Sequence, residues 1–225
     1  MNLNLLTKAE LDNRFQYRCK HKHNGLRHPQ CYENNAGIQP RIGFADIETT
    51  SLNADSGICL SWCIKPLNGK VIKRSILLEE LHDGEFDKGV IEDFITESQN
   101  FDTLVWHYGT DRKFDVPFLR TRAVCHKLNF PEYKCLNVAD TWPILRNKFK
   151  LNRNSLKNAC ELFGIPAKLH PLKWGWVSHE LMTGNPVRMQ RALNYNMKHN
   201  VEDVESTEQL WLKISKYVRK IQTSI

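Results

Sequence analysis

The spacing of apolar and polar positions changes once along the chain, after a short N-terminal segment. In that segment, a capping box that begins at Thr7 and a partial apolar stripe predict a helix over 7–18. Residues 32–40 are polar, and we interpret them as a linker. The pattern therefore predicts an N-terminal region at 1–40 and a main domain at 41–225.

In the main domain, runs rich in β-branched and aromatic residues alternate with helical stripes. The expected strands are 41–50, 58–65, 71–78, 102–109 and 136–144. The expected helices are 87–98, 109–127, 155–163, 178–183 and 188–199, with a last helix at 200–221 that either follows or continues the one before it. Consecutive strands followed by alternating helices and strands indicate an α/β fold with a mixed five-stranded sheet flanked by helices.

The first expected strand carries two acids inside an otherwise apolar run. Asp46 and Glu48 are separated by one residue, so in a strand both leave the same face, about 7 Å apart along the chain. Neighbouring carboxylates repel each other and resist burial unless a cation lies between them. A hard divalent ion is the natural occupant, and a solvated pair of acids is the alternative interpretation.

Cysteine and histidine residues crowd the segment after the first helix. Cys19, His21, His23, His28 and Cys31 lie within thirteen residues, and tetrahedral zinc needs four such ligands. We predict a small zinc-knuckle-like arm in which one structural zinc is held by Cys19, His23, His28 and Cys31, with His21 as an alternative ligand. A basic loop that contacts phosphate and a chance cluster are the competing interpretations.

Composition narrows the class of protein. The 225 residues are 41% hydrophobic, which suits a soluble chain with one sizeable core. No segment approaches the roughly 18 apolar residues of a membrane span, and the first residues lack a secretory signal. An intracellular protein without membrane contact, of cellular or viral origin, is expected. Disulfides are uncommon there, so we expect the remaining cysteines to be core residues, namely Cys59, Cys63, Cys125, Cys135 and Cys160.

The net charge and its distribution along the chain indicate the kind of partner. The formal net charge is +7, and the stretch between Asp140 and Glu161 has no acid but five basic residues, Arg146, Lys148, Lys150, Arg153 and Lys157. A polyanion is the first partner to consider, and a solubilising surface is the alternative. If the polyanion is a nucleic acid, Phe44, Tyr108 and Trp142 are candidates for stacking on a base, and a place in the core is the alternative for these aromatic residues.

Two further candidate acids follow Asp46 and Glu48 along the chain. Asp115 lies near the start of the helix after the fourth strand, and Asp203 lies in the last helical region. His199 precedes Asp203 by four residues, which places both side chains on one face of a helix, although a surface histidine at a helix end is the alternative. Tyr195 lies one further turn upstream.

With these residues in place, the chain resembles the DEDD superfamily of 3′ to 5′ exonucleases, which have a ribonuclease H-like fold. The first motif matches Asp46-Ile47-Glu48-Thr49-Thr50, the second matches Phe114-Asp115, and the third runs from His199 to Asp203. The resemblance covers 41–212 and is strongest to stand-alone exonucleases and to the proofreading domains of B-family DNA polymerases. One departure is that a histidine occupies the spacing of the tyrosine subclass.

The resemblance implies two Mg²⁺ or Mn²⁺ ions held by Asp46, Glu48, Asp115 and Asp203. It also implies that His199 acts as general base or positions the attacking water, with Tyr195 as the weaker candidate. A histidine can accept a proton at neutral pH, where a tyrosine cannot. Asp140 is expected to be a hydrogen-bonding neighbour of the site.

The expected reaction is hydrolysis of phosphodiester bonds of DNA, with RNA as a second possible substrate, to release nucleoside 5′-monophosphates. The partner would be a nucleic acid with a free 3′ end, single-stranded DNA first of all. Substrate contacts are expected from Thr49, Thr50, Phe114, Arg146, Lys148, Lys150 and Arg153. The alternative function is a catalytically silent nucleic-acid-binding module that uses the same fold and the zinc arm.

Overall fold

The structure is a computed structural model, which describes residues 6–37, 40–82, 84–132, 135–166, 172–218 and 223–224. Its centre is one mixed sheet with the strand order β3-β2-β1-β4-β5-β6. The strands are β1 (Ile42–Thr49), β2 (Cys59–Pro66), β3 (Ile72–Ser75), β4 (Thr103–Trp106), β5 (Asn137–Asp140) and β6 (Thr223–Ser224). The predicted mixed sheet of five strands is confirmed, and a sixth strand of two residues extends it beyond β5.

The acidic strand β1 lies in the interior of this sheet. It pairs antiparallel with β2, so that Asp46 is opposite Cys63 and Glu48 is opposite Ser61. On its other side it pairs parallel with β4, with Phe44 opposite Val105. The β1–β2 register shifts after Glu48, a local irregularity at the end of the acidic segment.

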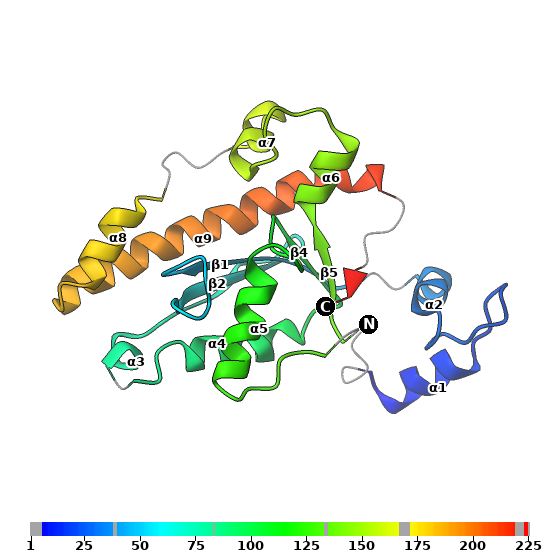
Figure 1. The fold of residues 1–225 in the computed structure, drawn as a ribbon. Helices are drawn as coiled ribbons and strands as arrows, with labels where there is room; N and C mark the ends of the chain where they lie inside the picture. The colour runs from blue at the N-terminus through cyan, green and yellow to red at the C-terminus, as the bar shows by residue number, and fades with distance from the viewer. Residues whose placement is uncertain are drawn as a thin grey trace.

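Helices cover both faces of the sheet (Figure 1). Ala45 and Ile47 of β1 face the core formed with α4 (Lys88–Ser98) and α5 (Asp115–Cys125). Phe44 faces the other core, which α6 (Thr141–Lys148), α7 (Leu156–Leu162) and α9 (Pro186–Ile214) complete. Side chains alternate along a strand, so Asp46 and Glu48 point to the α9 face.

The helix α9 runs along the sheet over β1 and β2 (Figure 1). Its 29 residues make one continuous helix, so the second of the two sequence alternatives is correct. The side chain of Asn185 begins the helix by accepting hydrogen bonds from the backbone N–H groups of Val187 and Arg188. The helix ends at Ile214, earlier than the predicted residue 221, and residues 219–222 lie outside the described chain.

One predicted strand was wrong in its second half. We expected a strand over 136–144, whereas β5 ends at Asp140 and α6 begins at Thr141. The Asp140 carboxylate accepts a hydrogen bond from the Trp142 N–H, which caps the first turn of α6. A short apolar run does not distinguish strand from helix, and the cap decided the outcome.

Other boundaries also differ from the prediction. The third strand is shorter than expected, because Leu78 begins α3 (Leu78–His82), and α8 (Trp174–Leu181) begins before the expected residue 178. Within the expected linker, α2 (Pro29–Ala36) occupies residues up to 36. Pro29 at its start and Gly37 at φ +66° after its end are helix-boundary signals that the sequence already contained.

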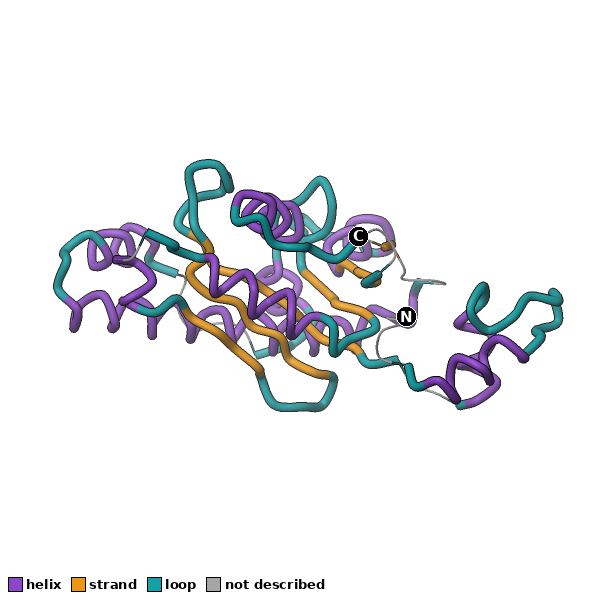
Figure 2. Tube along the Cα trace, turned by 90° about the horizontal axis from the view of Figure 1, so that it is seen from below, coloured by secondary structure: helices purple, strands orange, loops and turns teal. Residues whose placement is uncertain are grey.

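The helices α1 (Lys8–Gln16) and α2 lie together, away from the sheet (Figure 1; Figure 2). The predicted capping box at Thr7 is present. Arg14 forms a salt bridge with Glu33 at 3.1 Å, and its guanidinium carbon lies 4.7 Å from the ring centre of Tyr32. The division into 1–40 and 41–225 stays a prediction.

The expected cysteine core is partly correct. Cys59, Cys63 and Cys160 are buried, whereas Cys125 and Cys135 are exposed. Cys125 ends α5, and Cys135 lies just before β5, so both are at the margin of the apolar runs that suggested burial. In the part of the chain that is described, no helix combines the length and the apolar composition of a membrane span.

Candidate active site and candidate metal centre

The structure brings together three of the four acids that the sequence singled out. Carboxylate oxygens of Asp46, Glu48 and Asp203 all lie within 4.8 Å of one another. All three residues are half-buried. β1 supplies two of the acids from adjacent positions on one face, and α9 supplies the third because it packs across that face.

The fourth acid, Asp115, is buried beside this cluster. It is the first residue of α5 and is 5% exposed. Its Oδ1 accepts a hydrogen bond of 3.2 Å from the N–H of Ile47, the residue between the two acids of β1. Burial raises the pKa of Asp115 to about 7, and the negative charges of Asp140 and Asp203 act in the same direction.

The negative charge of the acids also affects the pKa of a residue on the neighbouring strand, β2. Burial raises the pKa of the Cys63 thiol well above its ordinary value, and the negative charge of Asp46 across the β1–β2 pair is the next cause. Carboxylates gathered in this way repel each other. A hard divalent cation prefers oxygen ligands and would offset that repulsion, so the donor set fits Mg²⁺ or Mn²⁺.

His199 is buried in the middle of α9 and is not a surface histidine at a helix end. It is 3% exposed, and the ring of Tyr195 lies against it in a T-shaped arrangement with 4.7 Å between ring centres. Tyr195 in turn packs on Trp176 of α8, with 5.2 Å between ring centres. The imidazole, one turn before Asp203, therefore packs against one aromatic ring that is itself held by another, a contact that the spacing alone did not predict.

The sequence interpretation missed a buried polar network beside the acids. Ser61, which is opposite Glu48 in the sheet, donates a hydrogen bond of 2.9 Å to Asn196 Oδ1. Asn200 Nδ2 donates to Ser61 Oγ at 3.1 Å, and all three side chains are fully buried. The sequence signal for this network was a pair of asparagines four residues apart, the second of them about one helical turn before Asp203. The network joins α9 to β2.

Asp140 is a hydrogen-bonding hub. Its Oδ1 accepts from the backbone N–H of Tyr108 at 2.9 Å and from that of Trp142 at 2.8 Å. Its Oδ2 accepts from Gly109 N at 3.1 Å and from Thr110 Oγ1 at 2.9 Å. The buried carboxylate thus ties the loop after β4 to the start of α6.

That loop approaches Asp115 closely. A Cβ atom on Gly109 would lie 2.7 Å from Asp115 Oδ2 and 2.8 Å from Trp106 Cβ. Because no side chain fits there, glycine is required at this position. The loop after β4 and the start of α5 therefore form one wall beside the acids.

The residues expected to contact substrate lie in different environments. Thr49 Oγ1 donates to the carbonyl of Ser51 at 2.7 Å, and Thr50 Oγ1 accepts from Ile58 N at 2.9 Å, so both hydroxyls hold the loop after β1. Phe114 is partly buried against the core. The basic residues are exposed, namely Arg146, Lys148, Lys150 and Arg153.

Of the three aromatic residues considered for base stacking, one is excluded. Phe44 has no exposed surface and belongs to the core between the sheet and α9. Tyr108 is exposed and Trp142 is half-buried. Only these two can meet a ligand.

The predicted zinc ligands also converge. One ligand atom from each of Cys19, His21, His23 and His28 lies within 4.8 Å of the others. Cys31 is close as well, with its Sγ 3.9 Å from His28 Nδ1. Four of the five candidates therefore form one cluster, which contains His21 as well as His23, and Cys31 lies beside it through its contact with His28.

Local backbone geometry favours a thiolate at Cys19. Burial opposes ionisation, but hydrogen bonds from the backbone of His21 and His23, and from the Cys31 side chain, leave the pKa of Cys19 lowered. His23 Nδ1 is buried and has no hydrogen-bond partner among the described residues. A thiolate and an imidazole nitrogen at such distances fit zinc.

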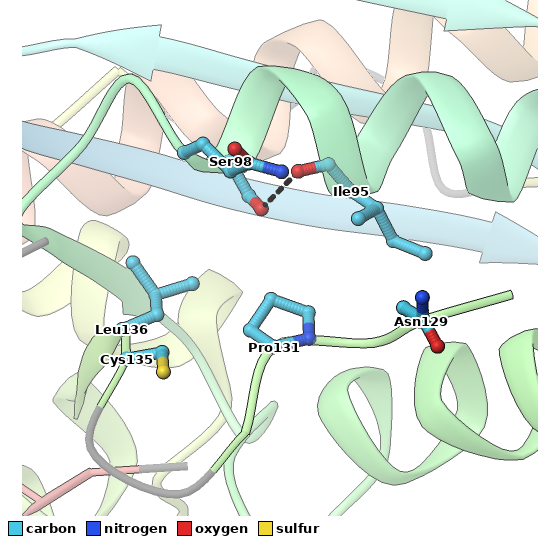
Figure 3. A pocket seen from close by; sticks show the side chains of 7 residues that line it. Ile95, Ser98, Asn129, Pro131, Cys135 and Leu136 are labelled. Atoms are coloured by element: carbon cyan, nitrogen blue, oxygen red, sulfur yellow. Dashed lines mark hydrogen bonds between the residues drawn. The ribbon is translucent and has the colours of Figure 1, made fainter. Parts of the chain in front are cut away.

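A separate pocket of about 130 Å³ lies near the start of β5 (Figure 3). It is formed by α4 and by the segment before β5, including Ile95, Pro131 and Leu136. β5 begins near this pocket, whereas the acids lie toward the carboxyl end of β1, which runs in the same direction as β4 and β5. The pocket contains none of the predicted site residues.

Comparison with sequences gives no match, either to protein-family models or to curated proteins. Comparison with solved structures gives matches. The family B DNA polymerase from the hyperthermophilic archaeon Pyrobaculum calidifontis matches 80% of this chain with a TM-score of 0.61 and 18% identity. The match covers 25% of the polymerase chain, so this chain spans about a quarter of that protein.

Brucella melitensis NrnC bound to pGG matches 79% of this chain and 73% of its own, with a TM-score of 0.50 and 19% identity. Both matches cover about four fifths of this chain, so the likeness extends over most of its fold. The chain has a ribonuclease H-like fold. The fold expected from the resemblance to the DEDD exonucleases is therefore confirmed.

Proposed function

We propose that the protein is a metal-dependent 3′ to 5′ exonuclease that hydrolyses phosphodiester bonds of DNA and releases nucleoside 5′-monophosphates. RNA is the second substrate to test. The observation that carries the proposal is the convergence of Asp46, Glu48 and Asp203 within 4.8 Å, with buried Asp115 bonded to the strand between the first two. A purely structural or binding role gives no reason to gather carboxylates against a phosphate ligand.

Asp46, Glu48, Asp115 and Asp203 would hold two Mg²⁺ or Mn²⁺ ions. When bound, such ions lower the pKa of a water molecule and stabilise the departing oxygen. The ionised carboxylates are needed to bind them, and a nearby cation favours the ionised form of Asp115. The site would then accept an anionic phosphodiester, because the cations offset the acids.

We assign His199 to the attacking water, as general base or as the residue that positions it. Its place on α9, one turn before Asp203, supports this assignment. Tyr195 packs edge-on against the imidazole, so it fixes the ring orientation in this proposal. The exposed basic residues from Arg146 to Arg153 and the loop that holds Thr49 and Thr50 complete the proposed substrate surface.

Nucleic acid is the proposed partner. The net charge of +7 and the exposed basic stretch favour a polyanion. The similar NrnC structure is bound to pGG, which is consistent with an oligonucleotide ligand here. We further propose one structural zinc, held by Cys19, His23, His28 and Cys31 or with His21 in place of His23. Donor atoms of Cys19 and the three histidines cluster, and Cys31 Sγ lies 3.9 Å from His28 Nδ1.

The decisive experiment uses 5′-labelled single-stranded DNA and RNA with Mg²⁺, Mn²⁺ or EDTA. We expect a ladder that shortens from the 3′ end with metal and no cleavage in EDTA. Asp46→Asn and Asp203→Asn should be inactive. Glu205→Gln is the matched control, since Glu205 is an exposed acid on α9 two residues from Asp203. Intact substrate under every metal condition, with binding retained, would instead support the catalytically silent module.

A further inference from the structure

Two aromatic rings lie next to each other on the surface beside the acids. Tyr108, in the loop after β4, is 45% exposed, and Trp142 lies in the first turn of α6. Their ring centres are 5.2 Å apart and the planes meet at 71°. Large aromatic side chains in such a place lose contact with water when a flat ligand covers them.

Two cations lie on these rings. Lys113 Nζ is 4.0 Å from the ring centre of Trp142 and 4.7 Å from that of Tyr108. The guanidinium carbon of Arg146 is 5.3 Å from the centre of Trp142. Neither cation forms a salt bridge with an acid of the described chain. The surface thus offers aromatic faces and unneutralised positive charge together.

The aromatic pair is held in place by Asp140. A single buried oxygen, Oδ1, accepts the backbone N–H of Tyr108 and that of Trp142. Tyr108 has φ +69°, a left-handed conformation that is uncommon for an aromatic residue. Such conformations persist where the surroundings fix them, and they concentrate at functional sites. The backbone that carries the Tyr108 ring is therefore held in one conformation.

The pair borders the acidic cluster. β4 runs parallel to β1, with Val105 opposite Phe44, so the residues that follow Trp106 lie alongside the acidic half of β1. Gly109, next to Tyr108, packs against the Asp115 carboxylate. A chain that reaches the acids can therefore also reach the rings.

We propose that Tyr108 and Trp142 bind an unpaired base, while Lys113 and Arg146 bind the phosphates that flank it. This combination selects single-stranded nucleic acid, because a base in a duplex is already stacked on its neighbours. Aromatic faces tolerate every base, so the surface binds without sequence preference. The proposal rests on the proposed exonuclease function and names the part of the site that holds the substrate near its 3′ end.

Binding is tested without catalysis. Fluorescence anisotropy of a 5′-labelled single-stranded oligonucleotide is measured without added Mg²⁺ or Mn²⁺, with the full chain and with the Tyr108→Leu and Trp142→Leu variants. We expect each variant to bind roughly tenfold more weakly, whereas Tyr108→Phe stays near wild type. Tyr217→Leu is the control, since Tyr217 is an exposed tyrosine with a lysine 5.3 Å from its ring centre. Equal affinity of both leucine variants and wild type, with normal circular dichroism, overturns the proposal.

An abasic series shows whether a base is what binds. Oligonucleotides lacking one base at each successive position from the 3′ end are compared. We expect wild type to lose affinity at one position and Tyr108→Leu to show no further loss there. Equal sensitivity of wild type and Tyr108→Leu at every position, or binding of blunt duplex as tight as that of single strands, overturns the proposal.

Hydrolysis separates this proposal from the exonuclease itself. With Mg²⁺ or Mn²⁺, we expect the leucine variants to raise KM about tenfold and to leave kcat near wild type. If wild type does not cleave, the exonuclease function fails while the anisotropy results still test the rings. If wild type cleaves and the leucine variants match it in KM and in affinity, the exonuclease function stands and only the proposed base binding by Tyr108 and Trp142 is wrong.

Discussion

Asp46 on β1 and Asp203 on α9 present carboxylate oxygens within 4.8 Å of each other, although they lie at opposite ends of the main domain's sequence. Packing of a single continuous helix across the acidic strand produces this contact. Ser61, Asn196 and Asn200 anchor that helix by buried hydrogen bonds. The arrangement brings like charges together, which is unfavourable for stability and suited to cation binding.

Neutralising one of these acids should stabilise the protein when no divalent cation is present. At separations near 4 Å, repulsion between two carboxylates amounts to roughly 1 to 4 kcal/mol in partly solvated surroundings. We expect Asp46→Asn to unfold at a higher temperature than wild type in EDTA. Adding Mg²⁺ should raise the Tm of wild type but not that of Asp46→Asn. Differential scanning calorimetry checks both, with Glu205→Gln as control, and a lower Tm for Asp46→Asn in EDTA contradicts the charge argument.

Removing the Ser61 hydroxyl should loosen α9 at the site. Ser61→Ala leaves buried Asn196 and Asn200 groups without their partner, at a cost of about 1 to 3 kcal/mol. We also expect the metal concentration needed for half-maximal activity to rise about 10- to 100-fold, because Asp203 is displaced.

Ser98→Ala is the matched control for this change. Ser98 is equally buried, and its hydroxyl bonds to Ile95 O within α4, at the pocket of Figure 3. The Ser98→Ala variant should alter the stability of the protein without altering the metal concentration needed for activity. If both serine variants shift the metal dependence equally, the network does not position Asp203.

His199 and Tyr195 can be separated by conservative changes. His199→Gln should reduce kcat by about 10² to 10⁴-fold, the usual contribution of a positioned proton acceptor. Tyr195→Phe keeps the ring contact with His199 and should change kcat by less than about tenfold. Single-turnover cleavage of labelled DNA measures both. The reverse order of effects would assign the attacking water to Tyr195.

The cysteine and histidine cluster should hold one zinc per chain in metal analysis of purified protein. Cys19→Ser and His28→Ala should lose the metal, because each removes a donor from the cluster. Replacing zinc with Co²⁺ counts the thiolates. Cys31→Ser should reduce the thiolate-to-cobalt absorption by roughly half, because Cys31 is one of the two proposed thiolate ligands, and unchanged absorption contradicts Cys31 as a ligand. Protein that folds normally without bound zinc contradicts the site.

Asp87 should make stability sensitive to acid. It is fully buried and accepts hydrogen bonds from Arg122, His126 and Cys59 N. Burial opposes its ionisation, but the Arg122 and backbone hydrogen bonds overcome this and lower its pKa. A lowered folded-state pKa means that the unfolded chain binds the proton more readily. The stabilisation is therefore present above the ordinary aspartate pKa of about 3.9 and is lost as pH falls through the folded-state value.

Urea unfolding from neutral to acid pH measures this effect. Asp87→Asn should cost about 3 to 5 kcal/mol at neutral pH, because Arg122 is left as a largely buried cation without its partner. The difference from wild type should shrink in acid. Asp55→Asn, which changes an exposed aspartate, should follow wild type. An equal acid dependence of wild type and Asp87→Asn contradicts the assignment.

The sequence by itself determined the elements whose signals are local. Alternation placed Asp46 and Glu48 on one face of a strand, and helical spacing placed His199 and Asp203 on one face of a helix. The sheet of five strands and the capping box at Thr7 followed from the same kind of pattern. Dense cysteine and histidine spacing also predicted the cluster around Cys19, because short loops cannot separate neighbouring residues far in space.

Only the tertiary structure decided the contacts that join distant segments. The pairing of Glu48 with Ser61, the Asn196 and Asn200 bonds, and the Asp140 oxygen that holds Tyr108 and Trp142 depend on strand register and helix rotation. A sequence pattern carries the period of an element but not its rotation against a neighbour, which packing of whole faces sets. For the same reason, burial excluded Phe44 as a ligand contact, although the sequence had left it a candidate for stacking on a base.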